Sequence, residues 1–194
     1  MQERFFAHCT ASEYAAQGRG YAYPWPKRFR CPNCGVRSRL RRHGFYSRYY
    51  LGLEYQGRIE IRRYYCKACG QTVSELPWFC QGRFQYAPWS ILWLIAETGR
   101  RSMEAVARSA RDAGLECMTR QLLNFYRRRL ADNVHLLELA LRDATGAAVL
   151  SSDEDIKKRA VAALSHNILG ADAAMHFWTV HCGRQAKTVL NPRQ

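Results

Sequence analysis

Four cysteines in two matched pairs are the residues whose spacing most clearly predicts chemistry. Cys31 and Cys34 are separated by two residues, as are Cys66 and Cys69, and a glycine follows each pair. Two intervening residues let both thiolates reach one ion from a tight turn, and the glycine allows the positive φ that turns backbone amides toward the sulfurs. Four thiolates fill a tetrahedral shell. The pairs therefore predict a closed, structural Zn²⁺ site with no open position for chemistry.

Two other chemistries share parts of this pattern. A lone Cys-x-x-Cys pair is also typical of redox sites, and four thiolates also bind iron–sulfur clusters. Two pairs that flank a predicted hairpin favour zinc over both. The cysteines without a paired neighbour, which we interpret as small buried hydrophobic residues, are Cys9, Cys80, Cys117 and Cys182. His8 and His181 each precede one of them, so a second metal site remains an alternative.

The segment between the cysteine pairs is rich in arginine and tyrosine. Residues 46–53 and 58–65 predict the two strands of a β-hairpin, with Gly57 in the connection. This hairpin has little apolar material of its own, so zinc should supply much of its folding free energy. A guanidinium fork donates two parallel hydrogen bonds to a phosphate, and tyrosines pack between such contacts. The nucleic-acid-binding residues predicted here are Arg37, Arg39, Arg41, Arg42, His43, Arg48, Arg58, Arg62 and Arg63.

The charge of the chain is strongly asymmetric. There are 30 Lys and Arg residues against 16 Asp and Glu residues, a net charge of +14, and the two signs balance from Asp132 onward. The basic front predicts a polyanionic partner, double-stranded DNA with RNA as the alternative. No apolar run approaches the roughly 20 residues that span a bilayer, and the start of the chain lacks the apolar stretch of a signal peptide. We therefore expect no membrane association and a reducing, cytoplasmic location.

The chain after residue 87 has the periodicity and the capping residues of helices. Pro88 suits the first turn of one helix, and Ser102 and Thr119 are N-cap residues for two more. The helix capped by Thr119 is expected to continue to Thr145. Apolar spacing predicts helices over 89–98, 103–113, 119–145 and 153–169, and a strand over 175–180.

Two of these helices, joined by a glycine-containing turn over 114–118, have the pattern of a helix-turn-helix. In that motif, the N-terminal residues of the second helix contact base edges in the major groove. The residues that the pattern places on bases are Thr119, Arg120, Gln121 and Asn124, with Arg127 and Arg128 along phosphates. Arg100, Arg101, Arg108 and Arg111 are expected to extend the basic surface. Periodicity leaves open a plain helical bundle with a basic outer face.

The predicted fold class is α+β, a small β zinc ribbon followed by an all-α helix-turn-helix and a helical C-terminal segment. The residues before the first cysteine pair are rich in aromatic side chains. Two prolines bracket Trp25 and disfavour a helix, so we expect this segment to be loop-like. The expected segments are an N-terminal extension over 1–27, a zinc ribbon over 28–80, a helix-turn-helix over 86–131 and a helical segment over 132–194.

Three motifs resemble a known family. These are C-P-x-C-G at 31–35, R-H-G-F-Y at 42–46 and I-R-R-Y-Y-C-K-A-C-G-Q-T at 61–72. They resemble the N-terminal zinc ribbon of bacterial insertion-sequence transposases, and also related short bacterial proteins with a zinc ribbon and a helix-turn-helix. The resemblance covers about residues 28–130. It implies DNA binding linked to a mobile element, and it says little about residues 131–194.

A full transposase of that type carries three metal-binding carboxylates in a catalytic domain, and this chain departs from that pattern. Asp153, Glu154 and Asp155 are adjacent at an expected helix start, where acids favour the helix dipole. We therefore predict a non-catalytic, zinc-dependent DNA-binding protein that serves transposition or transcription regulation. The alternatives are an RNA- or ribonucleoprotein-binding module, an adaptor that docks a protein partner through 132–194, and a truncated or atypical transposase or nuclease.

Overall fold

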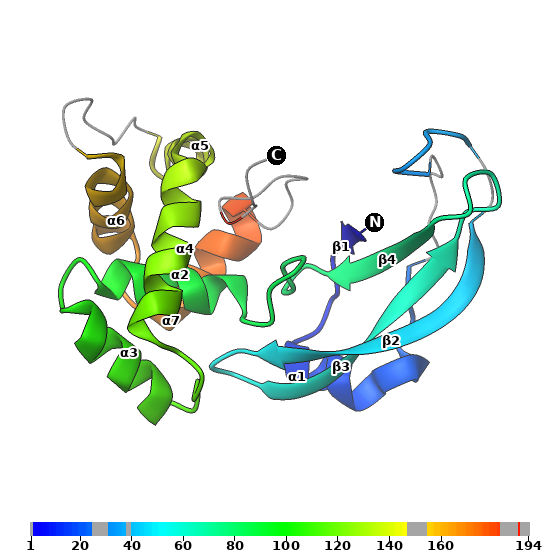
Figure 1. The fold of residues 1–194 in the computed structure, drawn as a ribbon, viewed down its shortest axis with the longest axis horizontal. Helices are drawn as coiled ribbons and strands as arrows, with labels where there is room; N and C mark the ends of the chain where they lie inside the picture. The colour runs from blue at the N-terminus through cyan, green and yellow to red at the C-terminus, as the bar shows by residue number, and fades with distance from the viewer. Residues whose placement is uncertain (1, 25–30, 38–39, 147–154, 183–189, 191–194) are drawn as a thin grey trace. The chain divides into compact units, whose positions relative to one another are not determined.

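The computed structural model describes residues 2–24, 31–37, 40–146, 155–182 and 190. The chain divides into two compact units, Met1–Tyr86 and Ala87–Gln194 (Figure 1). The first unit is built on a β-sheet that carries the four-cysteine cluster, and the second unit is helical. The mixed α+β class is therefore confirmed, whereas the division into four segments stays a prediction.

The sheet of the first unit has the strand order β1-β4-β3-β2 over the described part of the chain (Figure 1). Strands β2 (Arg41–Leu51) and β3 (Gln56–Tyr65) form the expected antiparallel hairpin. Strand β4 (Thr72–Pro77) pairs antiparallel with β3, and β1 (Gln2–Phe5) pairs parallel with β4. Gly57 lies inside β3, not in the connection between the strands as the sequence predicts.

Residues 2–24 are part of this sheet unit, so the expectation of a loop-like extension was wrong for them, whereas Trp25 and the residues up to 30 lie outside the described residues. After β1, helix α1 (Ala11–Gln17) begins at a capping box in which Thr10 and Glu13 each accept a hydrogen bond from the other's backbone amide. Tyr14 of α1 is fully buried, and its hydroxyl donates to the carbonyl oxygen of Glu60 in β3 at 2.8 Å. Tyr14 therefore belongs to the core, and the half-buried Tyr21 and Tyr23 pack against its ring with centroids at 4.7 and 6.1 Å.

The hairpin therefore has more apolar support than its own sequence suggests. Ile59 and Ile61 of β3 are almost completely buried. The large side chains that are fully buried in this unit are Tyr14, Tyr50, Ile59, Ile61, Tyr64, Leu76 and Phe79. The half of the hairpin far from the cysteines is thus stabilised by this core, and zinc is not its sole source of folding free energy.

The second unit confirms most of the expected helices and their caps. The Ser102 and Thr119 hydroxyls accept hydrogen bonds from the amides of Ala105 and Leu122. Pro88 is in the first turn of its helix. The elements are α2 (Pro88–Glu97), α3 (Met103–Asp112), α4 (Arg120–Asp132), α5 (Val134–Thr145), α6 (Ile156–Asn167), α7 (Ala171–Phe177) and a π-helical turn η2 (Trp178–Cys182).

Two expectations about this unit were wrong. The helix capped by Thr119 does not continue to Thr145, because Asn133 separates α4 from α5 with φ −116° and ψ 26°. The amide group of the Asn133 side chain donates to the carbonyl oxygen of Arg129 at 2.8 Å, which stabilises the break. The predicted strand over 175–180 is helical instead, and it buries Phe177 and Trp178.

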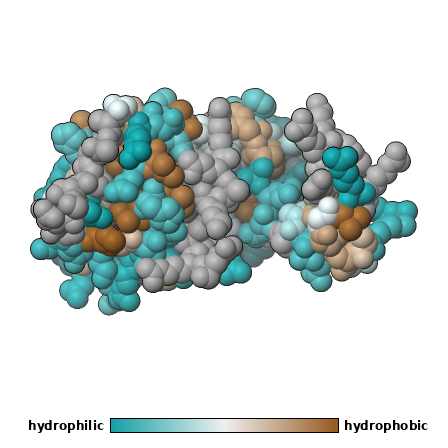
Figure 2. All heavy atoms as spheres, turned by 90° about the horizontal axis from the view of Figure 1, so that it is seen from above, coloured by the Kyte–Doolittle hydropathy of each residue, from teal (hydrophilic) through white to brown (hydrophobic). Residues whose placement is uncertain are grey.

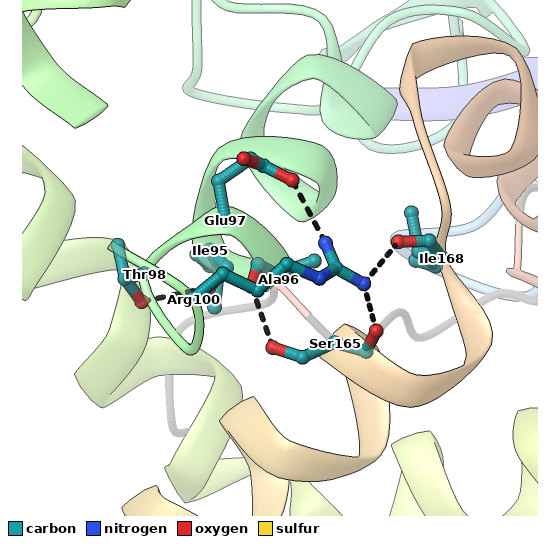
Figure 3. Close-up of polar contacts among 7 residues, drawn as sticks. All are labelled: Ile95, Ala96, Glu97, Thr98, Arg100, Ser165 and Ile168. Atoms are coloured by element: carbon teal, nitrogen blue, oxygen red, sulfur yellow. Dashed lines mark hydrogen bonds and ion pairs between the residues drawn. The ribbon is translucent and has the colours of Figure 1, made fainter.

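A polar cluster joins the end of α2 to the end of α6 (Figure 3). Arg100 donates to the Glu97 carboxylate at 2.8 Å and to the carbonyl oxygens of Ser165 and Ile168. The Ser165 hydroxyl donates back to the carbonyl oxygen of Ala96. A cation at the C-terminal end of α6 complements the helix dipole. Arg100 thus holds two helices together, and we no longer assign it to the basic surface.

The core of the helical unit is aliphatic. Its buried residues include Ile91, Leu92, Leu94, Ile95, Leu123, Leu130, Leu137, Leu164 and Trp178. Hydrophobic residues also reach the surface between hydrophilic ones on the face drawn in Figure 2. Among the helices described, none is long and apolar enough to cross a membrane.

We expect Arg100→Gln to destabilise the helical unit by about 1–3 kcal/mol, because three acceptors lose their charged donor. Arg108→Gln is the matched control, since it removes the same charge from an exposed position on α3 and should change stability by only about 0.5 kcal/mol. Urea unfolding followed by circular dichroism measures both variants. Equal stabilities would show that the cluster of Figure 3 contributes nothing.

Candidate zinc centre and basic surface

The two cysteine pairs lie at the same end of the hairpin, one before β2 and one after β3. Each pair closes a tight turn in which the amide of the following glycine donates to the carbonyl oxygen of the first cysteine. This distance is 2.8 Å from Gly35 to Cys31 and 2.9 Å from Gly70 to Cys66. The two glycines have φ values of +71° and +69°, in the left-handed region that other residues disfavour. The matched turns confirm the geometry expected of two knuckles.

The four sulfur atoms are spaced as ligands of a single ion. All lie within 4.8 Å of one another. The Sγ atoms of Cys31 and Cys69 are 3.7 Å apart, and those of Cys34 and Cys66 are 3.9 Å apart. A tetrahedron with Zn–S bonds of about 2.3 Å has edges of about 3.8 Å. A multi-iron cluster would hold its cysteines farther apart. The donor set and its spacing fit zinc.

Backbone amides and a side chain orient the sulfurs. The amide of Gln71 hydrogen-bonds Cys69 and lowers the pKa of its thiol, and Asn33 adds to this effect. The amide of Val36 acts in the same way on Cys34, but desolvation and the neighbouring cysteines outweigh it and raise the pKa of Cys34 to about 11. Thiols held this close oppose one another's ionisation, and a bound dication removes that opposition.

A small hydrophobic cluster connects the zinc site to the sheet. Cys31 and Cys66 are buried together with Leu40, Tyr64 and Val73. Because Tyr64 belongs to β3 and Val73 to β4, the metal and the end of the sheet share one cluster. Loss of zinc should therefore disorder the cysteine end of the unit first.

Arginines and aromatic rings face one another across the hairpin. Arg58 lies over the ring of Tyr49 at 4.7 Å from its centroid, and Arg62 lies over Phe45 at 4.6 Å. Both are directly opposed pairs of β2 and β3. Cation–π contact holds each guanidinium over a ring, and Arg58 also donates to the Tyr49 hydroxyl at 3.4 Å.

The other predicted ribbon residues at the surface lie near the cysteine end. The exposed ones are Arg37, Arg41, Arg42 and His43. The ring of His43 lies 5.6 Å from that of Tyr65. These side chains belong to one end of the hairpin, together with the knuckles. Arg39 lies outside the described residues.

Two predicted arginines bond within the protein instead. Arg48 donates to the carbonyl oxygens of Gln81, at 3.2 Å, and Phe84. Arg63 donates to the Thr72 hydroxyl of β4 at 2.9 Å. Both guanidiniums brace the sheet unit, so we leave them out of the contacts proposed below.

The N-terminal segment adds an arginine that the sequence pattern did not single out. Arg19 lies 5.7 Å from the ring centroid of Phe45 and forms an ion pair with Glu60 at 3.0 Å. With Arg42 and Arg62 it borders a pocket of about 180 Å³. The aromatic composition of the first residues was the only sequence signal for the position of Arg19. It indicates that the segment packs, but it does not indicate which element it packs against.

A buried carboxyl group lies next to Arg62 in the neighbouring strand β4. Glu75 of β4 is directly opposite Arg62 on one side and Glu3 of β1 on the other, and it is 7% exposed. Burial raises the pKa of Glu75 to about 7, against the opposing effect of a hydrogen bond from Tyr64, and the nearby Glu3 raises it further. Its ionisation therefore falls within the physiological range.

In the helical unit, residues 113–119 join α3 to α4. Gly114 has φ +93°, and Leu115 and Met118 are buried beneath the turn. Arg111 braces it by donating to the carbonyl oxygen of Met118 at 2.9 Å. This connection is longer than the three or four residues usual in a helix-turn-helix, so that motif stays a prediction.

The residues predicted to read DNA lie on α4 and its cap. Arg120 and Asn124 are four residues apart, as are Asn124 and Arg128, and such residues share a helix face. Thr119 uses its hydroxyl as the N-cap, and Arg127 is half-buried and donates to the sulfur of Met103 at 3.5 Å. The exposed members of the set are Thr119, Arg120, Gln121 and Arg128.

The remaining cysteines and acids fall into simpler roles. Cys80 and Cys182 are buried as predicted, whereas Cys117 is exposed and Cys9 is partly exposed. No second group of three or more His, Cys, Asp or Glu residues converges in the described part of the chain. Asp155 caps α6 by accepting from the Lys157 amide at 2.6 Å. The two acids before it lie outside the described residues.

Residues 27–69 match the family described as the zinc-finger of transposase IS204/IS1001/IS1096/IS1165. No curated protein and no solved structure matches the chain. The matched segment contains both cysteine pairs and the whole hairpin of β2 and β3. The resemblance predicted from the sequence is thus confirmed for this segment, and its four cysteines form the Zn²⁺ site.

Removal of zinc, by chelation or by Cys66→Ser, should disorder the knuckles while the far half of the hairpin persists. We expect fast amide exchange at Gly35 and Gly70, because their hydrogen bonds exist only in the closed turns. The amides of Ile59 and Ile61 should stay protected by the apolar core. Hydrogen exchange before and after chelation measures both. An equal loss of protection at all four amides would show that the apolar core does not stay folded without zinc.

The raised pKa of Glu75 predicts a pH-dependent stability. A carboxyl group that protonates more readily in the folded state destabilises the fold above its unfolded pKa, so the penalty grows as the pH rises from about 4.5 to about 7. Glu75→Gln should therefore stabilise the protein by about 2–3 kcal/mol more at pH 8 than at pH 5.

Glu13→Gln is the control with the opposite sign. The backbone amide of Thr10 lowers the pKa of Glu13, so the stability that this carboxylate provides is lost as the pH falls. Denaturant unfolding at both pH values compares the variants. The same pH trend in the two would refute the assignment to Glu75.

Proposed function

We propose that this chain, whose residues 27–69 are a zinc ribbon of the transposase type, is a non-catalytic protein that binds double-stranded DNA. It would serve the transposition of a mobile element or transcription regulation, in the cytoplasm. The observation that carries the proposal is the set of arginines displayed on a hairpin that zinc anchors. Four thiolates leave the metal no open position for a substrate, which supports a structural role for it.

The hairpin would supply affinity through phosphate contacts. Arg58 and Arg62 are held over aromatic rings, which reduces the side-chain entropy lost when a guanidinium binds a phosphate. Arg41 and His43 lie farther along β2, toward the cysteines. Such contacts release counterions from DNA, so binding should weaken steeply with salt.

Helix α4 would supply sequence preference. Arg120 and Asn124 share one face at its N-terminal end, where a recognition helix contacts base edges. Arginine pairs with guanine and asparagine with adenine in the major groove. The capped start of α4 and the buried Leu115 and Met118 fix the position of these side chains, as the helix-turn-helix hypothesis requires.

A protein adaptor is the second candidate, and one observation favours it. Leu139 of α5 and Leu169 after α6 are 53% and 77% exposed, in a segment with balanced charge. Large exposed leucines suit contact with another protein, and the adaptor role would leave the ribbon mainly structural. An RNA-binding module remains the alternative for the basic surface itself.

Substitutions on the two surfaces should have different effects. Arg58→Ala should weaken specific and random duplexes alike and lower the salt slope by about one, because it removes a phosphate contact. Arg120→Ala and Asn124→Ala should each reduce affinity for a selected site by about 1–3 kcal/mol and leave random duplexes nearly unchanged. A site selected from a random library and fluorescence anisotropy at several salt concentrations provide the measurement. Identical losses on both duplexes for all three would remove the helix-turn-helix proposal.

A further inference from the structure

We infer that the pocket bordered by Arg19, Arg42 and Arg62 binds one unpaired nucleotide of a DNA strand. This deepens the proposed function and rests on it. The arginines come from three separate elements, the 3-10 turn η1 (Gly18–Gly20), β2 and β3. Aromatic rings complete the wall, among them Tyr21, Tyr23 and Phe45. We call this site the arginine–aromatic pocket.

The volume of the pocket restricts what it can hold. It measures about 180 Å³, well below the roughly 300–1,000 Å³ of pockets for drug-sized ligands. This size suits a single nucleobase with its phosphate better than a larger ligand.

The rings of the aromatic wall pack against one another. The rings of Tyr21 and Tyr23 meet edge to face at 5.1 Å, and Tyr23 lies 5.7 Å from Phe45 at a tilt of 58°. The Tyr23 hydroxyl donates to the carbonyl oxygen of Glu60 at 3.0 Å, which fixes that ring. Every nucleobase has a flat π-face, so stacking on such a wall is strong and tolerant of sequence.

The arginines add the charge that a phosphate requires. Arg62 lies 4.6 Å from the centroid of Phe45, and Arg19 lies 5.7 Å from the same ring, so one aromatic residue carries two guanidiniums. The partner of Arg19 is Glu60, but the Arg19 side chain is 72% exposed, and an ion pair so open to water is weak. A phosphate can therefore replace that carboxylate with little loss.

The combination of aromatic rings and arginines in one pocket favours an unpaired nucleotide over other anions. An acidic peptide would satisfy the arginines but would leave the flat rings without a partner. In an intact duplex, the flat faces of the bases are stacked inside and only their edges are exposed, so a pocket that stacks on a base stays empty. A frayed end, an overhang or an extruded base presents both the ring and the phosphate together. The outer arginine Arg58 has no part in this pocket and would bind paired DNA equally well.

Arg58 provides the matched control for Arg62. Both lie on β3, four residues apart and on the same face, and both stack on an aromatic residue of β2, but only Arg62 borders the pocket. The zinc-loaded full chain would be titrated with a blunt duplex and with the same duplex carrying a short single-stranded overhang. We expect the overhang to bind roughly tenfold more tightly. Arg62→Gln should abolish that preference, whereas Arg58→Gln should weaken both duplexes by the same factor.

A second variant, a fluorescent base and a competition experiment also test the pocket. Arg19→Gln alters an exposed side chain and should reduce the overhang preference about threefold, even if Arg62→Gln fails to fold. A 2-aminopurine base in the overhang should be quenched on binding to the wild type, because it stacks on the aromatic wall. Displacement of the overhang by dAMP at comparable concentration would overturn the assignment to a DNA strand in favour of a free nucleotide.

Failure of the pocket assignment and failure of the proposed function give different results. Equal affinity for blunt and overhanging duplexes in the wild type, or equal losses in Arg62→Gln and Arg58→Gln with zinc content and circular dichroism unchanged, would overturn the pocket alone. Absence of binding to either duplex at low salt would overturn the proposed function and, with it, this inference.

Discussion

The register between β2 and β3 is the constraint on which the basic surface depends. Side chains alternate along a strand, so a slip of one residue would carry every arginine of one face to the other. Zinc prevents that slip at one end of the hairpin, because Cys34 precedes β2 and Cys66 follows β3, and both belong to one four-sulfur site. The stacking of Arg62 on Phe45 therefore depends on a register that zinc holds at one end of the hairpin and the apolar core supports at the other.

Local sequence patterns predicted the zinc site, the hairpin and the helix caps because each depends on a few neighbouring residues. Two cysteines and a glycine define a knuckle, and one hydroxyl before an apolar run defines a cap. The sulfur spacing and the bonds of Ser102 and Thr119 agree with those patterns. The break at Asn133 was not predicted, because the apolar spacing continues across it and a single side-chain bond decides the ending.

What depends on distant residues could not be predicted. Arg48 and Arg100 belong to a basic stretch of sequence, but each donates to carbonyl oxygens far along the chain. Arg19 has no motif around it, and only the packing of Tyr14 against β3 brings its turn beside Phe45. The sequence shows which groups an arginine can bind, but whether it binds a group of the protein or a ligand depends on the tertiary structure.

The parallel pairing of β1 with β4 implies an order of events during synthesis. Strand β1 must wait for residues 72–77 before it has a neighbour, and closing so long a loop is entropically unfavourable until the rest of the sheet exists. The hairpin, its knuckles and Val73 are close together in the chain and can close around a metal without β1. We therefore expect the nascent chain to bind zinc first and to add β1 to the sheet last.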